Sequence, residues 1–212
     1  MASEAQSERA GSRQPRPFDP ARAGQLDDPA RLAYLPPLDL LRLLDPPAGT
    51  AVLDFGAGTG TYAIALARLR PDLRIIAMDE QPQMLAHLKR KLAAADAPGN
   101  VLPMLPAELE SGGESFPRVL ALNVLHELGD AVLRDLPRRL APEGRILFVD
   151  WNAAAERPVG PPSEHVYRPG EALMRLRHLG YHAVLAGEFA YHYAVIASWT
   201  EPASGLLAAG SA

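Results

Sequence analysis

A glycine-rich segment that follows a short apolar run carries the clearest chemical signal in this chain. The run 51–55 is apolar except for Asp54, and Gly56, Gly58 and Gly60 follow at alternate positions before a helical pattern begins. Glycines let the backbone turn sharply and approach a ligand closely, and the helix behind them offers unpaired N–H groups. A carboxylate at position 54 would repel a pyrophosphate but can bind a cationic amino group. The segment therefore predicts a ligand site at the end of a buried strand.

Further polar residues follow the next expected strands. Asp79 and Glu80 end the second apolar run, where a carboxylate can bind both hydroxyls of a ribose. Ala107 and Glu108 follow the third run, where an adenine would lie. All of these positions fall beyond the carboxyl ends of parallel strands, at the edge where such sheets bind ligands. Together they favour S-adenosylmethionine as the ligand.

The elements that position these residues alternate between strand and helix. Strands are expected at 51–55, 73–78, 101–105, 118–122, 145–149, 181–186 and 191–199. Helices are expected at 29–35, 38–44, 61–70, 82–95, 130–140 and 171–179, with Asp130 as the N-cap of the fifth. Apolar strands that alternate with helices are typical of an α/β protein with a parallel sheet covered on both faces. The closely spaced last two strands predict an antiparallel hairpin at one edge.

Length and composition limit the classes of protein. At 212 residues one domain is the default, and a net charge of −4 gives no overall positive field for nucleic acid or anionic lipid. The absence of cysteines excludes disulfides, thiolate metal sites and cysteine nucleophiles. We expect a cytoplasmic protein. Its expected parts are a disordered leader at 1–17, a helical cap at 18–48, a main domain at 49–200 with a substrate loop at 152–168, and a flexible tail at 201–212.

With these motifs in place, the chain resembles the class I S-adenosylmethionine-dependent methyltransferases, and within them the type 11 family. The stretch 54–60 matches the family's acidic-x-Gly-x-Gly-x-Gly loop, which wraps the methionine part of the cofactor. Asp79 matches the ribose-binding acid, Met84 the residue that packs near the adenine, and 123–128 the segment under the methionyl group. The resemblance implies a Rossmann-like three-layer sandwich. Its seven-stranded, mostly parallel sheet has the order 3-2-1-4-5-7-6 and an antiparallel last strand.

One departure from the family pattern lies after the third strand. The family commonly has Asp there and this chain has Pro106, so the Ala107 N–H and the Glu108 carboxylate are expected to replace the lost adenine contact. The complete set expected to bind the cofactor is Asp54, Gly56, Ala57, Gly58, Gly60, Asp79, Glu80, Met84, Ala107, Glu108 and Asn123.

Three residues are candidates for catalysis. Methyl transfer from a sulfonium is an in-line displacement in which the protein aligns the acceptor and can supply a base. His126 follows the fourth strand and is the first candidate for that base. His165 and Tyr167 come from the loop 152–168, whose length in a compact domain favours a function. Trp151 and Tyr34 fit the acceptor pocket as well as they fit ordinary packing.

Two histidine patterns carry weaker predictions. His178 and His182 are four residues apart, but the helix ends between them, so no metal site is expected. On the last strand, alternation places Tyr191 and Tyr193 on one face and His192 on the other.

Several functions remain open. The leading one is methyl transfer to a small-molecule acceptor. An NAD-dependent oxidoreductase is kept because 58–63 also fits the loose GxGxxA pattern of dinucleotide sites. A non-catalytic S-adenosylmethionine-binding protein is kept because no motif fixes the acceptor site. The expected partner is a small-molecule substrate, with a homodimer as an option and without nucleic acid or membrane.

Overall fold

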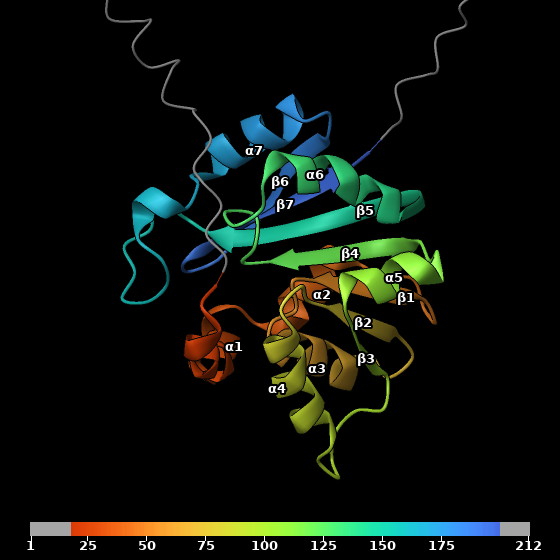
Figure 1. The fold of residues 1–212 in the computed structure, drawn as a ribbon. Helices are drawn as coiled ribbons and strands as arrows, with labels where there is room; N and C mark the ends of the chain where they lie inside the picture. Colours follow the sequence, from red (N-terminus) through yellow and green to blue (C-terminus); the bar gives the residue numbers. More distant parts are fainter. Residues whose placement is uncertain (1–17, 200–212) are drawn as a thin grey trace, which may run out of the picture.

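The computed structural model describes residues 18–199, which form a seven-stranded sheet between two layers of helices (Figure 1). The strand order is β3-β2-β1-β4-β5-β7-β6. β7 runs antiparallel to β5 and β6, and the other neighbouring strands are parallel. The strands are β1 Ala51–Phe55, β2 Arg74–Met78, β3 Val101–Met104, β4 Phe116–Leu122, β5 Leu140–Trp151, β6 His182–Glu188 and β7 His192–Ser198. The predicted fold class, strand order and antiparallel last strand are confirmed.

Proline sets the start of several helices. It occupies the first position of α2, α4, α5 and α7, where its missing N–H costs no hydrogen bond. The α-helices are α1 Ala30–Tyr34, α2 Pro37–Leu44, α3 Thr61–Leu69, α4 Pro82–Leu92, α5 Pro106–Gly112, α6 Asp130–Asp135 and α7 Pro169–His178. Within residues 18–199, the 3₁₀ segments are η2 Pro20–Asp27, η3 Leu136–Arg139 and η4 Ser163–His165. The predicted leader 1–17 and tail 201–212 lie outside the described residues.

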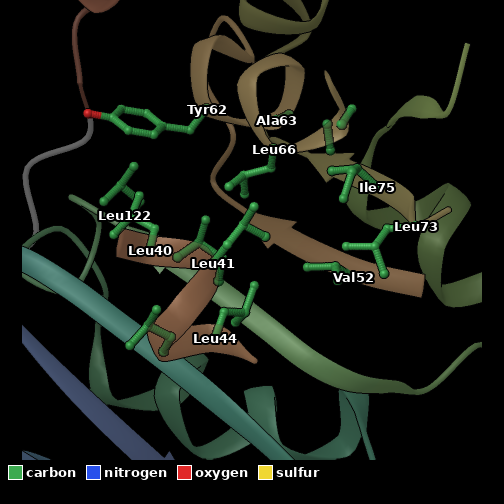
Figure 2. Packing of buried hydrophobic residues seen from close by; sticks show 14 of the residues in the cluster. Leu40, Leu41, Leu44, Val52, Tyr62, Ala63, Leu66, Leu73, Ile75 and Leu122 are labelled. Carbon is green, nitrogen blue, oxygen red and sulfur yellow. The ribbon is translucent and has the colours of Figure 1, made fainter. Parts of the chain in front are cut away.

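Each face of the sheet has its own hydrophobic core. Alternate residues of β1 point to opposite faces, so Val52 packs under α2, α3 and α4 while Leu53 packs under α5, α6 and α7. In the first core, Leu40 and Leu66 meet Val52 and are fully buried (Figure 2). Burying such a side chain contributes about 1.5–3 kcal/mol. The two cores hold the carboxyl ends of the parallel strands at one edge, where the predicted site residues gather.

The structure corrects the helix predicted at 130–140. α6 ends at Asp135, and the chain tightens into η3 through Pro137, whose ring is incompatible with an α-helix interior. β5 already begins at Leu140. The N-cap of α6 is Gly129 rather than Asp130. The sequence prediction also missed α5, which starts at Pro106.

The segment before β1 is fastened to α3. The Tyr62 hydroxyl points from α3 toward this segment and donates to the carbonyl oxygen of Arg31 at 2.9 Å (Figure 2). Asp27 accepts hydrogen bonds from the Thr59 and Thr61 hydroxyls and from the Lys91 ammonium. These contacts hold η2 and α1 against the glycine segment. Within residues 18–199, no helix is long and apolar enough to cross a membrane.

Candidate cofactor and acceptor site

A cavity of about 1140 Å³ opens at the carboxyl ends of β1, β2, β4 and β5. Typical pockets for one small ligand measure roughly 300–1,000 Å³, so this cavity has room for a cofactor and an acceptor. Its lining combines the glycine segment 56–59, residues 122–128 after β4, the end of β5, and the cap formed by η2 and α1.

The glycine segment uses a backbone conformation that few other residues adopt. Gly56, Gly58 and Gly60 have φ angles of 75°, 56° and 74°. The Gly56 and Ala57 N–H groups both donate to the Met78 carbonyl at 2.9 Å, which ties the segment to the end of β2. Gly56, Ala57 and Gly58 line the cavity. Gly60 instead packs on α4, since a Cβ there would lie 2.3 Å from Leu88.

Two buried carboxylates flank this segment. Asp79 accepts from the Gly58 N–H at 2.8 Å and from the Gln81 N–H at 2.9 Å. Asp54 is 2% exposed and lines the cavity. Its burial and the nearby charge of Asp79 raise the pKa of Asp54 to about 7. A cationic group beside Asp54 would reverse both effects, which fits the amino group predicted for this position.

The predicted adenine end differs in detail from the sequence expectation. Met84 and the exposed Glu80 line the cavity as expected, but Ala107 and Glu108 lie outside the lining. The Glu108 carboxylate turns back to accept from the Leu105 N–H and caps α5. Pro106 and Leu109 take the places in the lining that were expected for Ala107 and Glu108.

Asn123 lies where β4 leaves the sheet. Its φ of 59° turns the chain sharply, and its N–H donates to the Val149 carbonyl at 2.7 Å. The residue lines the cavity. Its side-chain Oδ1 is buried and has no hydrogen-bond partner among residues 18–199. Buried polar atoms are rarely left unpaired, so this oxygen is suited to accept from a bound ligand.

His126 and Asp150 form a hydrogen-bonded pair at the cavity wall. The His126 Nδ1 lies 2.8 Å from Asp150 Oδ1, and the His126 N–H donates to Asp150 Oδ2 at 2.8 Å. Asp150 is fully buried and also accepts from the Trp151 N–H at 2.7 Å. The His126 Nε2 lies 3.6 Å from Glu127 Oε1. Asp150 thus fixes the orientation of the His126 ring, as in other acid–base pairs.

The charge on Asp150 also sets the basicity of His126. Burial alone lowers the pKa of the imidazole, but the charge and hydrogen bond of Asp150, together with Glu127, raise it above the ordinary histidine value. Burial raises the pKa of Glu127 to about 7, against the opposing effect of His126. The sequence placed Asp150 at the end of a strand. Its contact with His126 could not be predicted, because that contact requires β4 and β5 to be neighbours in the sheet.

Comparison with known proteins identifies the kind of domain that carries this cavity. A protein-family model described as a methyltransferase domain matches residues 53–146. The crystal structure of a SAM dependent methyltransferase from Aquifex aeolicus matches with a TM-score of 0.75 and 27% identity, over 85% of this chain and 98% of that one. The chain therefore carries a methyltransferase domain with the fold of the S-adenosylmethionine-dependent enzymes.

Two further matches agree with this domain type and this fold. The methyltransferase is 37% identical over 103 residues to a malonyl-[acyl-carrier protein] O-methyltransferase of Halorhodospira halophila. That stretch is 47% of this chain and 34% of the relative, so it spans about a third of that protein. The fold also matches the structure of a DhpI–SAH complex, at a TM-score of 0.64 and 22% identity, over 86% of this chain and 94% of that one.

One end of the cavity lies under residues 18–34 and the loop 152–168, which was predicted to contact the substrate. Trp151, Tyr34 and His165 line the cavity there. Gly160 has a φ of 93°, and a Cβ at this position would lie 3.0 Å from the Trp151 ring, so the loop packs directly on that ring. Tyr167 lies outside the lining and packs on the second core, with the Arg175 guanidinium 5.2 Å from its ring centroid. Of the two catalytic candidates in this loop, His165 lines the cavity and Tyr167 does not.

The tyrosines of the last strand do not share a face. Tyr193 belongs to the second core, whereas the Tyr191 ring lies 5.3 Å from Tyr34, on the side of His192. Strict alternation fails because β7 begins only at His192 and Tyr191 belongs to the preceding bend. Among residues 18–199, no group of three or more acidic or histidine side chains is placed to hold a metal ion.

Phe18 bridges the mouth of the methyltransferase cavity. Its N–H donates to Glu127 Oε2 at 3.1 Å, and its carbonyl accepts from the Gln81 side chain at 2.9 Å. Gln81 follows β2 and Glu127 follows β4, so the backbone at Phe18 crosses between two strand ends. Glu127 was not among the predicted site residues, because its importance depends on this contact with a segment 109 positions away.

Proposed function

We propose that this methyltransferase moves the methyl group of S-adenosylmethionine to a small-molecule acceptor that His126 deprotonates. The observation that carries the proposal is the His126–Asp150 pair, of which His126 lines the same cavity as the glycine segment. A base held by a buried carboxylate serves an acceptor that binds in protonated form. When bound, S-adenosylmethionine supplies an electrophilic methyl group on a sulfonium.

The residues that would hold the cofactor fit its three chemical parts. Asp54 would pair with the amino group, and the backbone of Gly56 and Gly58 would allow close approach of the methionyl chain. Asp79 would accept from the ribose hydroxyls while its two backbone hydrogen bonds hold the carboxylate in place. The apolar side chain of Met84 would pack on the adenine. The unpaired Oδ1 of Asn123 adds an acceptor within the same wall.

The acceptor would lie between His126 and the wall formed by Trp151, Tyr34 and His165. The cap at 18–48 and the loop 152–168 would exclude water from this end, because both contribute side chains to the lining. His126 would take the proton of the acceptor, and Asp150 would stabilise the resulting imidazolium.

A binding and turnover experiment tests the proposal. Thermal unfolding is followed with S-adenosylmethionine, S-adenosylhomocysteine and NAD; a ligand at a hundredfold excess over its Kd stabilises the protein by about 2.7 kcal/mol. Formation of S-adenosylhomocysteine is then measured with a panel of metabolite acceptors. Stabilisation by both sulfur nucleosides and turnover that depends on an acceptor support the proposal. Stabilisation by NAD alone contradicts it, and sulfur-nucleoside binding without any turnover favours a non-catalytic binding protein.

The setting of the enzyme is part of the same proposal. We infer that it acts in the cytoplasm on a small molecule, without nucleic acid or membrane, and that a homodimer is compatible with this role. The net charge of −4 supports the exclusion of nucleic acid, which selects for basic surfaces. Light scattering of the purified protein measures its oligomeric state, and a gel-shift assay with duplex and single-stranded nucleic acid tests the exclusion.

A further inference from the structure

Two aromatic rings line one end of the cavity, and a third, buried ring packs against both of them. Tyr34, at the end of α1, and Trp151, at the end of β5, both line the cavity, and their ring centroids are 6.1 Å apart. The ring of His192 lies 4.1 Å from that of Trp151. It lies 5.8 Å from that of Tyr34, and the two planes differ by 12°. Ring-shaped ligands gain most from aromatic rings in a lining, because stacked rings bury large apolar faces in a favoured geometry.

The ring of His192 packs against Tyr34 and Trp151 but does not line the cavity. The side chain is fully buried, and neither ring nitrogen has a hydrogen-bond partner among residues 18–199. Burial lowers the pKa of His192 to about 4, although the charge of Asp150 opposes the effect. The imidazole is therefore uncharged at neutral pH and offers no cation to an anionic acceptor.

The arginines that line the cavity are already engaged by the protein. They are Arg22, Arg31 and Arg139. Their guanidinium groups donate, in the same order, to the Gln25 side chain, the Leu26 carbonyl and the Glu110 carboxylate. A carboxylate ligand is usually held by the two parallel N–H groups of an arginine. Each of the three guanidinium groups is thus oriented by a contact within the protein.

The groups nearest to His126 are acidic. Asp150 lies 2.8 Å from its Nδ1, and Glu127 lies 3.6 Å from its Nε2. An acceptor that carried a negative charge would meet the Glu127 carboxylate in the lining and would lie near the buried Asp150. The nearby cation, Arg157, lies outside the lining and donates to the carbonyl oxygens of Asn152 and Pro161. A carboxylate acceptor would also give His126 no proton to remove at neutral pH, since carboxylic acids ionise near pH 4. The charges and the base both favour an acceptor that is neutral and protonated when it binds.

We propose that the acceptor is an uncharged aromatic compound with a phenolic hydroxyl, its ring packed against Tyr34 and the accessible part of Trp151 and its hydroxyl at His126. This inference rests on the proposed methyl transfer and names its substrate class. The hydroxyl proton passes to His126 Nε2 as the acceptor oxygen forms a bond to the methyl carbon. The bond between that carbon and sulfur breaks, and its electron pair stays on sulfur. The products are an aryl methyl ether, neutral S-adenosylhomocysteine and a proton that His126 later releases.

Tryptophan fluorescence tests the acceptor class without relying on turnover. The chain has two tryptophans, and Trp199 packs on Tyr181 outside the cavity lining. In a Trp199→Phe protein saturated with S-adenosylhomocysteine, Trp151 is the sole tryptophan reporter. The probes are 2-naphthol, 2-naphthoate, hexanol and hexanoate, which separate the effects of ring and charge.

The proposal predicts saturable quenching by 2-naphthol, with a Kd at least tenfold below that of 2-naphthoate. Added to the same protein, Tyr34→Leu should weaken 2-naphthol at least fivefold, while Tyr34→Phe, which keeps the ring, should stay within twofold. Equal or tighter binding of the naphthoate, no quenching by either ring probe, or an unchanged Kd in Tyr34→Leu would overturn the acceptor class. Failure of S-adenosylhomocysteine itself to bind would instead overturn the proposed function.

Discussion

The two halves of the cavity, one proposed to bind the cofactor and the other the acceptor, are built from different parts of the polypeptide. The cofactor half consists largely of backbone, with Gly56 and Gly58 folded against β2 and held by the Asp79 carboxylate. The acceptor half consists of side chains such as His126, Trp151 and Tyr34, which come from three separate elements. The conformation of the glycine segment depends on a short stretch of sequence. The arrangement of the side chains in the acceptor half depends on which strands are neighbours in the sheet. The two halves should therefore respond differently to mutation.

His126→Asn gives the largest expected effect and should leave the cofactor half intact. Loss of a general base lowers kcat by about 10²–10⁴-fold, whereas calorimetry should show a Kd for S-adenosylhomocysteine within twofold of wild type. His178→Asn is the matched control, because His178 is exposed at the end of α7. If His126→Asn keeps full kcat, His126 is not the base; a large loss of cofactor affinity would show that the two halves are not separable.

In contrast to His126→Asn, Asp79→Ala should weaken cofactor binding more than it lowers kcat. The substitution removes the acceptor of the Gly58 and Gln81 N–H groups and the proposed ribose contacts. Hydrogen bonds to a charged group contribute about 1.5–3 kcal/mol, so the Kd for S-adenosylhomocysteine should rise by about 10–100-fold. At saturating cofactor, kcat should fall far less. Unchanged affinity in calorimetry would remove Asp79 from the cofactor half.

The pH profile of activity separates the two acids beside His126. Because the charge of Asp150 raises the pKa of His126, the neutral base forms at higher pH in wild type. Asp150→Asn should therefore move the acidic limb of kcat/KM to lower pH, with a lower plateau. Glu127→Gln should move the acidic limb in the same direction but less far, because the charge of Glu127 raises the pKa of His126 less than the charge of Asp150 does. An unmoved limb in Asp150→Asn would show that another group is titrating.

Two glycines allow a stability test with an internal control. Gly60 and Gly49 both have positive φ, at 74° and 71°. A Cβ at Gly60 would lie 2.3 Å from Leu88, whereas a Cβ at Gly49 meets nothing within 4 Å. Left-handed backbone costs an L-residue about 1–2 kcal/mol, and overpacking adds about 1–3 kcal/mol. Gly60→Ala should therefore lower the free energy of unfolding by more than Gly49→Ala in urea titrations, and equal losses would contradict the packing role.

The sequence predicted the fold and the position of the glycine segment at the end of β1, because both depend on local patterns. Buried apolar runs fix the strands, and Asp54 with three alternating glycines marks the turn after β1. The missed features depend on tertiary contacts. Glu108 faces its own helix end, and Tyr167 packs on Arg175 instead of the cavity. Neither direction follows from residue type, because a side chain of a helix start or loop points wherever its neighbours hold it.

The role of Asp150 shows the same limit. His126 and Asp150 are 24 positions apart and meet because β4 pairs with β5 in the sheet. The position of Asp150 at a strand end was visible in the sequence, as it was for Asp54 and Asp79. Its hydrogen bond to His126 could be identified only from the three-dimensional structure, in which the two strands are neighbours.

The most direct test of the central claim is calorimetric titration of S-adenosylhomocysteine between pH 6 and pH 8. Asp54 has a pKa of about 7 in the free protein, and a cationic amino group should bind only its ionised form. The account predicts one-to-one binding that tightens about tenfold from pH 6 to pH 8. The substitution Glu127→Gln removes another carboxyl group with a pKa of about 7, and the same pH dependence of binding should persist in it. In Asp54→Asn the pH dependence should vanish. Absence of binding, or wild-type affinity that does not change with pH, would contradict the claim that Asp54 binds the amino group of the cofactor.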